Sequence, residues 1–163
     1  MIHLGRRHPQ DASRGQALVE FAIVLPLLVL IVLGIMQFGL LFWGQITLTQ
    51  VARDTGRWAA TQPACDQGTG TDQADVIGEA REIAAGSNLY GYAGGADPDL
   101  TVTPTWSLGT PCPPENNSTV EWVYIDMTYR VDVFLPLIAD TCMPSCQRTL
   151  STEVQFRMEP EAE

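Results

Sequence analysis

The chain has 163 residues and a formal net charge of −10 at pH 7, which allows one membrane anchor and one small domain. The charge is unevenly divided, because residues 1–15 have a side-chain balance of +2 and residues 45–163 have a balance of −11. An acidic surface argues against binding to nucleic acid, which requires basic patches. Since positive flanks stay in the cytoplasm, we expect the N-terminus inside and the acidic part outside.

A polar leader at residues 1–15 is followed by a long apolar segment. From Ala22 to Trp43 the only strongly polar side chain is Gln37, and a helix of this length spans ~33 Å, close to the hydrocarbon thickness of a bilayer. The segment is longer than the apolar region of a secretory signal peptide, and no A-x-A-like cleavage site follows it. It predicts a retained transmembrane helix over about residues 22–43.

Glu20 lies at the edge of this apolar segment. An ionisable group in such a place costs several kcal/mol unless it is paired, and it is therefore a functional candidate. The alternative interpretation is an ordinary interfacial charge beside a membrane anchor.

The helical pattern continues beyond the predicted membrane segment. Leu48, Val51, Ala52 and Ala59 recur at helical spacing, so we expect one helix over residues 16–61, ending before a proline. Pro26 should kink or locally melt this helix. Gly34 and Gly39 would let another helix approach closely.

The remaining residues, 62–163, predict an α+β globular domain. A short helix should begin after Asp72, an N-cap residue, and end at Gly86. Three segments then alternate between apolar and polar residues, namely 100–106, 123–133 and 150–158. Since each strand has one apolar face, an antiparallel sheet should be covered on one side by the amphipathic half of the long helix and by the short helix.

Four cysteines lie beyond the anchor, at positions 65, 112, 142 and 146. In an oxidising compartment they predict two disulfides with three possible connectivities. We favour Cys65–Cys112 with Cys142–Cys146, because the second pair closes a tight loop. The competing zinc interpretation is weak, since only two of the cysteines are closely spaced and both histidines precede the anchor.

The N-terminal region resembles the TadE-like minor pilins, or pseudopilins, of the tight-adherence (Tad, or Flp) type IV pilus system. The resemblance covers roughly residues 14–60 and rests on Arg14-Gly15, Glu20-Phe21, Leu25-Pro26, the stretch Gly34 to Gly39 and the stretch Val51 to Arg57. A type II secretion pseudopilin is a less favoured variant.

This resemblance implies a fold and a mechanism. The fold is pilin-like, with the long helix packed on a small sheet. A prepilin peptidase would cut between Gly15 and Gln16 and remove the leader, and the new α-amino group of Gln16 would pair with the carboxylate of Glu20. The partners implied are other pilin and minor pilin subunits, the peptidase, the inner-membrane assembly platform and membrane lipid. The processed subunit would become pilus-associated outside the cell.

Catalysis finds no support in the residues. No histidine lies outside the leader, and no phosphate-binding glycine loop precedes a helix, so we expect neither an enzyme nor a cofactor. The alternative to a pilus subunit is a permanently anchored extracytoplasmic binding module that never joins a filament.

Overall fold

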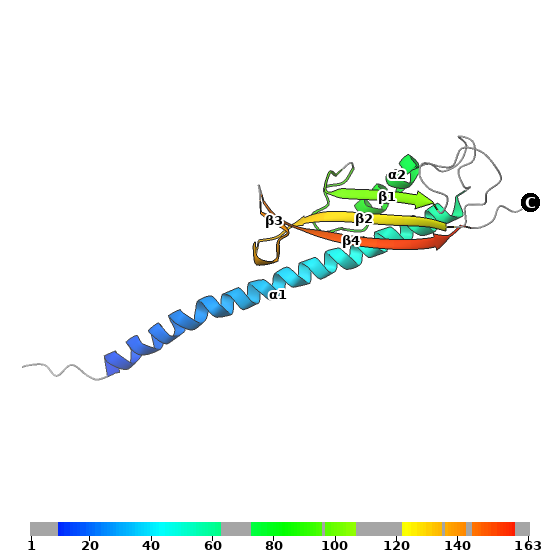
Figure 1. Cartoon of the computed structure of the whole chain (residues 1–163). Coiled ribbons are helices and arrows are strands. Elements are labelled where there is room, and N and C mark those ends of the chain that lie inside the picture. The colour runs from blue at the N-terminus through cyan, green and yellow to red at the C-terminus, as the bar shows by residue number, and fades with distance from the viewer. Residues whose placement is uncertain are drawn as a thin grey trace, which may run out of the picture. The chain divides into compact units, whose positions relative to one another are not determined.

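A computed structural model describes residues 10–62, 73–95, 97–106, 122–134, 136–142 and 145–158, with side chains of the first range described from Gly15 onward. The elements follow one another as two helices, two strands, a short 3-10 helix and two further strands (Figure 1). Their bounds are α1 Gln10–Thr61, α2 Gln73–Gly86, β1 Leu100–Trp106, β2 Trp122–Asp132, the 3-10 helix Pro136–Ile138, β3 Thr141–Cys142 and β4 Cys146–Arg157.

The chain divides by its internal contacts into two compact units, Met1–Phe38 and Gly39–Glu163. Helix α1 contributes residues to both. It begins at Gln10, six residues earlier than expected. In the sequence a proline precedes the first helical residue, which is compatible with a helix start at this point. The helix continues through Pro26.

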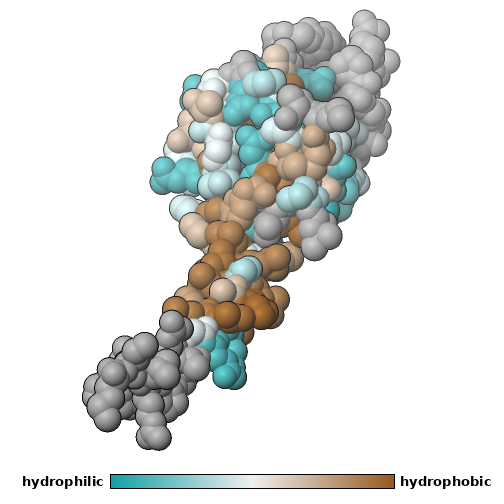
Figure 2. Space-filling view, turned by 90° about the vertical axis from the view of Figure 1, so that its left-hand side faces the viewer, coloured by the Kyte–Doolittle hydropathy of each residue, from teal (hydrophilic) through white to brown (hydrophobic). Residues whose placement is uncertain are grey.

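The first unit exposes an apolar helix surface. Large side chains between Leu18 and Phe38 are mostly exposed, and brown apolar residues form a continuous surface on the face of this helix seen in Figure 2. Among the residues that the structure describes, α1 is the one helix long and apolar enough to cross a membrane, judged by length and composition. Its most apolar stretch is not buried, which distinguishes it from the core helix of a soluble domain.

The second unit is built on a four-stranded antiparallel sheet with the order β1-β2-β4-β3. The expected alternation is present in all three long strands: Val123, Ile125 and Met127 on β2 are fully buried, whereas Asp126 between them is exposed. Strand β1 lies at one edge of the sheet. Pro104, which cannot donate a hydrogen bond to a ladder, is tolerated in such an edge strand.

The core of this unit lies on one face of the sheet. Leu48 and Val51 of α1 and Val76 of α2 are completely buried in the same apolar cluster as the inward side chains of β2. Gly44 and Gly56 of α1 approach side chains of β4 closely, which places the amphipathic part of α1 against the sheet. Helix α2 contacts β1.

The fold class is therefore α+β and pilin-like, with a long N-terminal helix, a short second helix and a small antiparallel sheet, as predicted. The 3-10 helix and strand β3 were not expected. Strand β4 begins at Cys146 rather than near residue 150, because its first residues pair with the two-residue strand β3 in a hairpin. Strand β3 has only two residues, and both are exposed. It therefore has no alternation of apolar and polar residues from which it could be predicted.

Candidate functional site

The candidate site lies near the start of α1, where the predicted processing and pairing residues follow one another along the helix. Gln16 and Glu20 are four residues apart and therefore neighbours on adjacent turns. The side-chain amide Nε2 of Gln16 donates a hydrogen bond to Oε1 of Glu20 at 3.2 Å. The structure thus brings these two predicted residues together within one chain, through the side chain of Gln16.

The surroundings of this pair are open. Gly15, Gln16 and Glu20 are exposed, and a Cβ added at Gly15 would meet no atom within 4 Å. Phe21, the aromatic residue after Glu20, is 61% exposed. The peptide bond between Gly15 and Gln16 is accessible but lies inside a helix, since α1 begins five residues before Gly15.

The predicted helix-packing residues lie further along α1. A Cβ added at Gly34 or at Gly39 would also meet no atom within 4 Å, so the chain itself does not fill the space beside either glycine. This space is available to a neighbouring helix, and close helix packing at the two glycines stays a prediction.

Cys142 and Cys146 form a disulfide across the β3–β4 hairpin, where they are register partners. Cys65 and Cys112, the other two cysteines of the predicted bridges, lie outside the described residues. The hairpin disulfide joins segments only four positions apart in sequence and therefore constrains a local turn.

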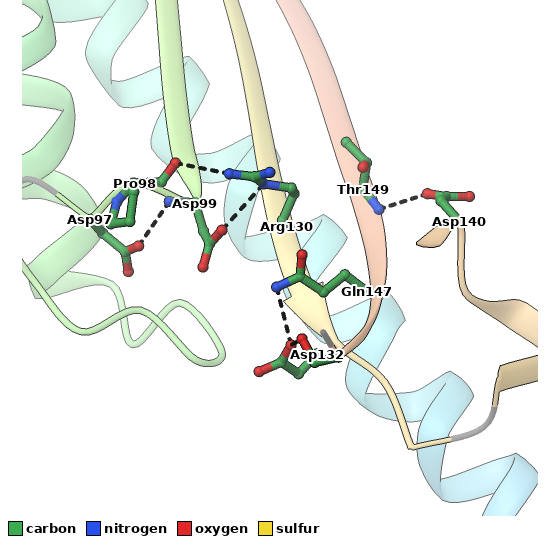
Figure 3. A network of polar contacts seen from close by, with 9 residues as sticks. Asp97, Pro98, Asp99, Arg130, Asp132, Asp140, Gln147 and Thr149 are labelled. Carbon is green, nitrogen blue, oxygen red and sulfur yellow. Dashed lines mark hydrogen bonds and ion pairs between the residues drawn. The ribbon is translucent and has the colours of Figure 1, made fainter. Parts of the chain in front are cut away.

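A second group of polar residues lies at one end of the sheet, and the sequence did not single it out (Figure 3). Arg130 of β2 forms an ion pair with Asp99 through Nε and Oδ1 at 3.2 Å, and its Nη2 donates to the carbonyl of Pro98 at 3.4 Å. Asp97 accepts hydrogen bonds from the main-chain nitrogens of Ala93 and Asp99. These contacts fix the turn that leads into β1.

The same end of the sheet carries contacts that hold the β3–β4 hairpin. The carboxylate of Asp140 accepts a hydrogen bond from Nη1 of Arg148 and another from the main-chain nitrogen of Thr149, both at 2.8 Å. Asp132 accepts from Gln147 at 3.2 Å, as Figure 3 shows. The carboxylates at this end of the sheet serve as acceptors for turns, and within the described parts of the chain no group of three or more His, Cys, Asp or Glu is arranged to hold a metal ion.

The electrostatics of the second unit centre on two tyrosines. Tyr92 and Tyr129 contact each other edge to face, with ring centroids 6.3 Å apart. Burial raises the pKa of Tyr129 far above its usual value, and the nearby Asp97 and Asp99 raise it further. The hydroxyl of Tyr92 donates a hydrogen bond to the carbonyl of Gly95 at 2.9 Å.

Comparison with known proteins bears on α1. Residues 15–57 match the family model TadE, described as TadE-like protein, and this range contains Gly15, Gln16 and Glu20. No curated protein and no solved structure matches the chain. The TadE-like family is related to the Tad pilus and is not a known enzyme family. The resemblance expected from the sequence is confirmed over residues 15–57, which are similar to the TadE-like family of the Tad system.

Proposed function

We propose that this chain is a minor pilin, or pseudopilin, of a Tad-type pilus. A prepilin peptidase cuts it between Gly15 and Gln16 at the cytoplasmic face of the membrane. The processed chain then leaves the bilayer for the filament, where its helix exchanges lipid for the helices of other pilin subunits. The acidic domain, residues 62–163, is extracytoplasmic throughout.

The contact between Gln16 and Glu20 is the observation that carries this proposal. This hydrogen bond shows that the carboxylate of Glu20 can reach Gln16, the residue at which cleavage would create the new N-terminus. Cleavage creates an α-ammonium group on Gln16, which can neutralise Glu20 in the same chain or in a neighbouring subunit. Pairing matters because a charge left alone among apolar helices is strongly destabilising.

Helix geometry around the cleavage site supports a role for Gly15 in processing. A protease binds an extended backbone, so the helical segment at Gly15 and Gln16 must unwind first. Glycine in the middle of a helix is less stable than alanine by roughly 0.5–1 kcal/mol. Gly15 therefore favours unwinding at the bond that is cut, and its lack of a side chain suits a narrow active site.

The test is the N-terminal mass of the full chain after expression with its prepilin peptidase. We expect a mature N-terminus at Gln16 for the natural protein and for Gly34→Val, and loss of cleavage for Gly15→Val. Both glycines lie in α1 with open space around a new side chain, so the control separates processing from packing. A mature N-terminus at Met1 in the presence of the peptidase would contradict the proposal and favour a permanently anchored binding module.

Assembly is tested separately. We expect Glu20→Ala to be cleaved normally but to be missing from sheared pili, because the carboxylate that pairs with the new ammonium is absent. Glu82→Ala, on the exposed surface of α2, is the matched control and should assemble normally. Recovery of Glu20→Ala in pili at the level of the natural protein would contradict the proposed role of the ion pair in assembly.

A further inference from the structure

Gln16 has a chemical property that the proposed cleavage would expose. In the intact chain its α-nitrogen is part of a peptide bond, and its side-chain amide donates to Glu20 at 3.2 Å. After cleavage the same residue carries both a free α-amino group and a side-chain amide. A glutamine in this position can react with itself.

The reaction is an intramolecular cyclisation. The α-amino nitrogen attacks Cδ of the side-chain amide, so that a bond forms between this nitrogen and Cδ. The bond between Cδ and Nε2 breaks, and Nε2 leaves as ammonia after taking up a proton from the attacking amine. The product is a five-membered lactam, and its nitrogen no longer carries a positive charge. Neither an oxidant nor a second substrate is required.

We propose that Gln16 is a site of N-terminal cyclisation in the processed protein and that Glu20 keeps it in the open form. This inference rests on the proposed cleavage after Gly15. The geometry supplies the means, because the exposed carboxylate of Glu20 lies within hydrogen-bond distance of Gln16 in the same chain.

Glu20 acts on both reacting groups. An opposite charge close by favours the ammonium form of an amine, and an ammonium has no electron pair with which to attack Cδ. The hydrogen bond from Nε2 also directs the side chain along the helix toward the next turn. Cyclisation instead needs the side chain folded back onto its own main-chain nitrogen.

Cyclisation would have a direct consequence for assembly. The lactam removes the positive charge that pairs with Glu20, so a cyclised subunit carries an unpaired carboxylate among apolar helices. By protecting Gln16, Glu20 preserves its own partner. The carboxylate of Glu20 thus has two roles. It pairs with the α-ammonium group of Gln16, and it slows the cyclisation that would remove this group.

The experiment follows the N-terminal peptide by mass spectrometry. The full chain is processed by prepilin peptidase, purified in detergent and incubated near neutral pH, and the loss of one ammonia from the peptide that begins at Gln16 is measured over time. Glu20→Gln keeps the size and the acceptor oxygen and removes the charge, whereas Glu20→Ala removes both. Glu82→Gln on α2 is the control for a carboxylate elsewhere, and Gln16→Ala cannot cyclise.

We expect cyclisation of Glu20→Gln to be roughly twofold to fivefold faster than that of the natural protein, the range that an exposed ion pair supports. Glu20→Ala should cyclise at least as fast as Glu20→Gln, and Glu82→Gln should match the natural protein. Equal rates for the natural protein and Glu20→Gln would overturn this inference while leaving the proposed function intact. A peptide that still begins at Met1 at time zero would overturn the proposed cleavage itself, and the inference with it.

Discussion

Gly56 shows how strongly a single residue can depend on a partner that is distant in sequence. It is buried on α1, and a Cβ added there would overlap the ring of Phe156 on β4. We expect Gly56→Ala to destabilise the protein by about 1–3 kcal/mol, as overpacking of a core does. Thermal unfolding of the full chain in detergent, followed by near-ultraviolet circular dichroism, measures the change.

Gly78→Ala is the matched control for Gly56→Ala. Gly78 also lies inside a helix, but a Cβ added there meets no atom within 4 Å. The higher helix propensity of alanine should therefore stabilise this variant by up to about 1 kcal/mol. If both variants unfolded at the same temperature, the close packing of α1 on β4 would be contradicted.

Tyr129 makes the stability of the second unit sensitive to alkaline pH. Burial is the main cause that raises the pKa of this phenol in the folded state, whereas an unfolded tyrosine titrates near about 10. The folded chain therefore keeps Tyr129 neutral while the unfolded chain ionises it, so stability present below about pH 10 is lost as the pH rises further. The chain has no lysine, and arginine stays charged in this range.

The measurement for Tyr129 is the unfolding temperature between about pH 9 and 11.5. We expect it to fall steeply above about pH 10 in the natural protein and less steeply in Tyr129→Phe. Tyr92, whose pKa is also raised, first by burial and then by Asp97, accounts for part of the slope that remains. An identical slope in both proteins would show that Tyr129 is not the group responsible.

At the candidate site, the resemblance implied that the future α-amino group of Gln16 pairs with Glu20, and this pairing stays a prediction. The structure shows a different contact between the same residues, from the side-chain amide of Gln16 to Glu20. The side-chain amide as donor was not predicted, because spacing fixes which side chains can meet and not which rotamers they adopt.

At the level of elements, β2 and β4 place two carboxylates opposite each other. Asp126 and Glu153 are register partners on the exposed face of the sheet, and neither forms an ion pair in the part of the chain that the structure describes. Like charges in this position are destabilising. We expect Glu153→Gln to stabilise the protein by about 0.2–1 kcal/mol at low salt.

Salt dependence checks the cause of this effect. At about 1 M salt the Debye length falls to ~3 Å, so the repulsion is screened and the advantage of Glu153→Gln should disappear. Asp126→Asn should give a similar gain, and the double variant should gain little more than either single one. A gain that persists at high salt would point to a change other than relief of this repulsion.

Secondary structure was predictable where a long pattern repeats. In strand β2 and in the amphipathic part of α1, apolar residues recur at a regular spacing along the element. The buried residues follow this spacing. The β3–β4 hairpin was missed because turn contacts hold it, including those of Asp140 with Arg148 and Thr149. The contact of Gly56 with Phe156 joins residues a hundred positions apart, and it depends on the placement of α1 against the sheet, which periodicity does not specify.

For the whole molecule, charge and hydropathy are separated along the chain in the order that an anchored, outward-facing domain requires. Arginines 6, 7 and 14 precede the apolar segment, and the acidic excess follows it. The apolar surface of α1 in the first unit is exposed, so it needs lipid or other helices to cover it. These features predict an orientation with the basic leader in the cytoplasm and the acidic domain outside it.

We expect the leader arginines to determine that orientation, because basic residues close to a membrane segment are retained on the cytoplasmic side. In whole cells that lack the prepilin peptidase and are made permeable only at the outer surface, added protease should digest the domain of the natural chain and leave the leader intact. Replacing Arg6, Arg7 and Arg14 with Asn removes the positive flank, and a fraction of that variant should become protected from external protease. Replacing Arg53 and Arg57 with Asn is the matched control, since these residues lie on the far side of the apolar segment and their removal should leave the orientation unchanged. A natural chain whose domain resists external protease would reverse the assigned topology, and the proposed place of cleavage could not stand with it.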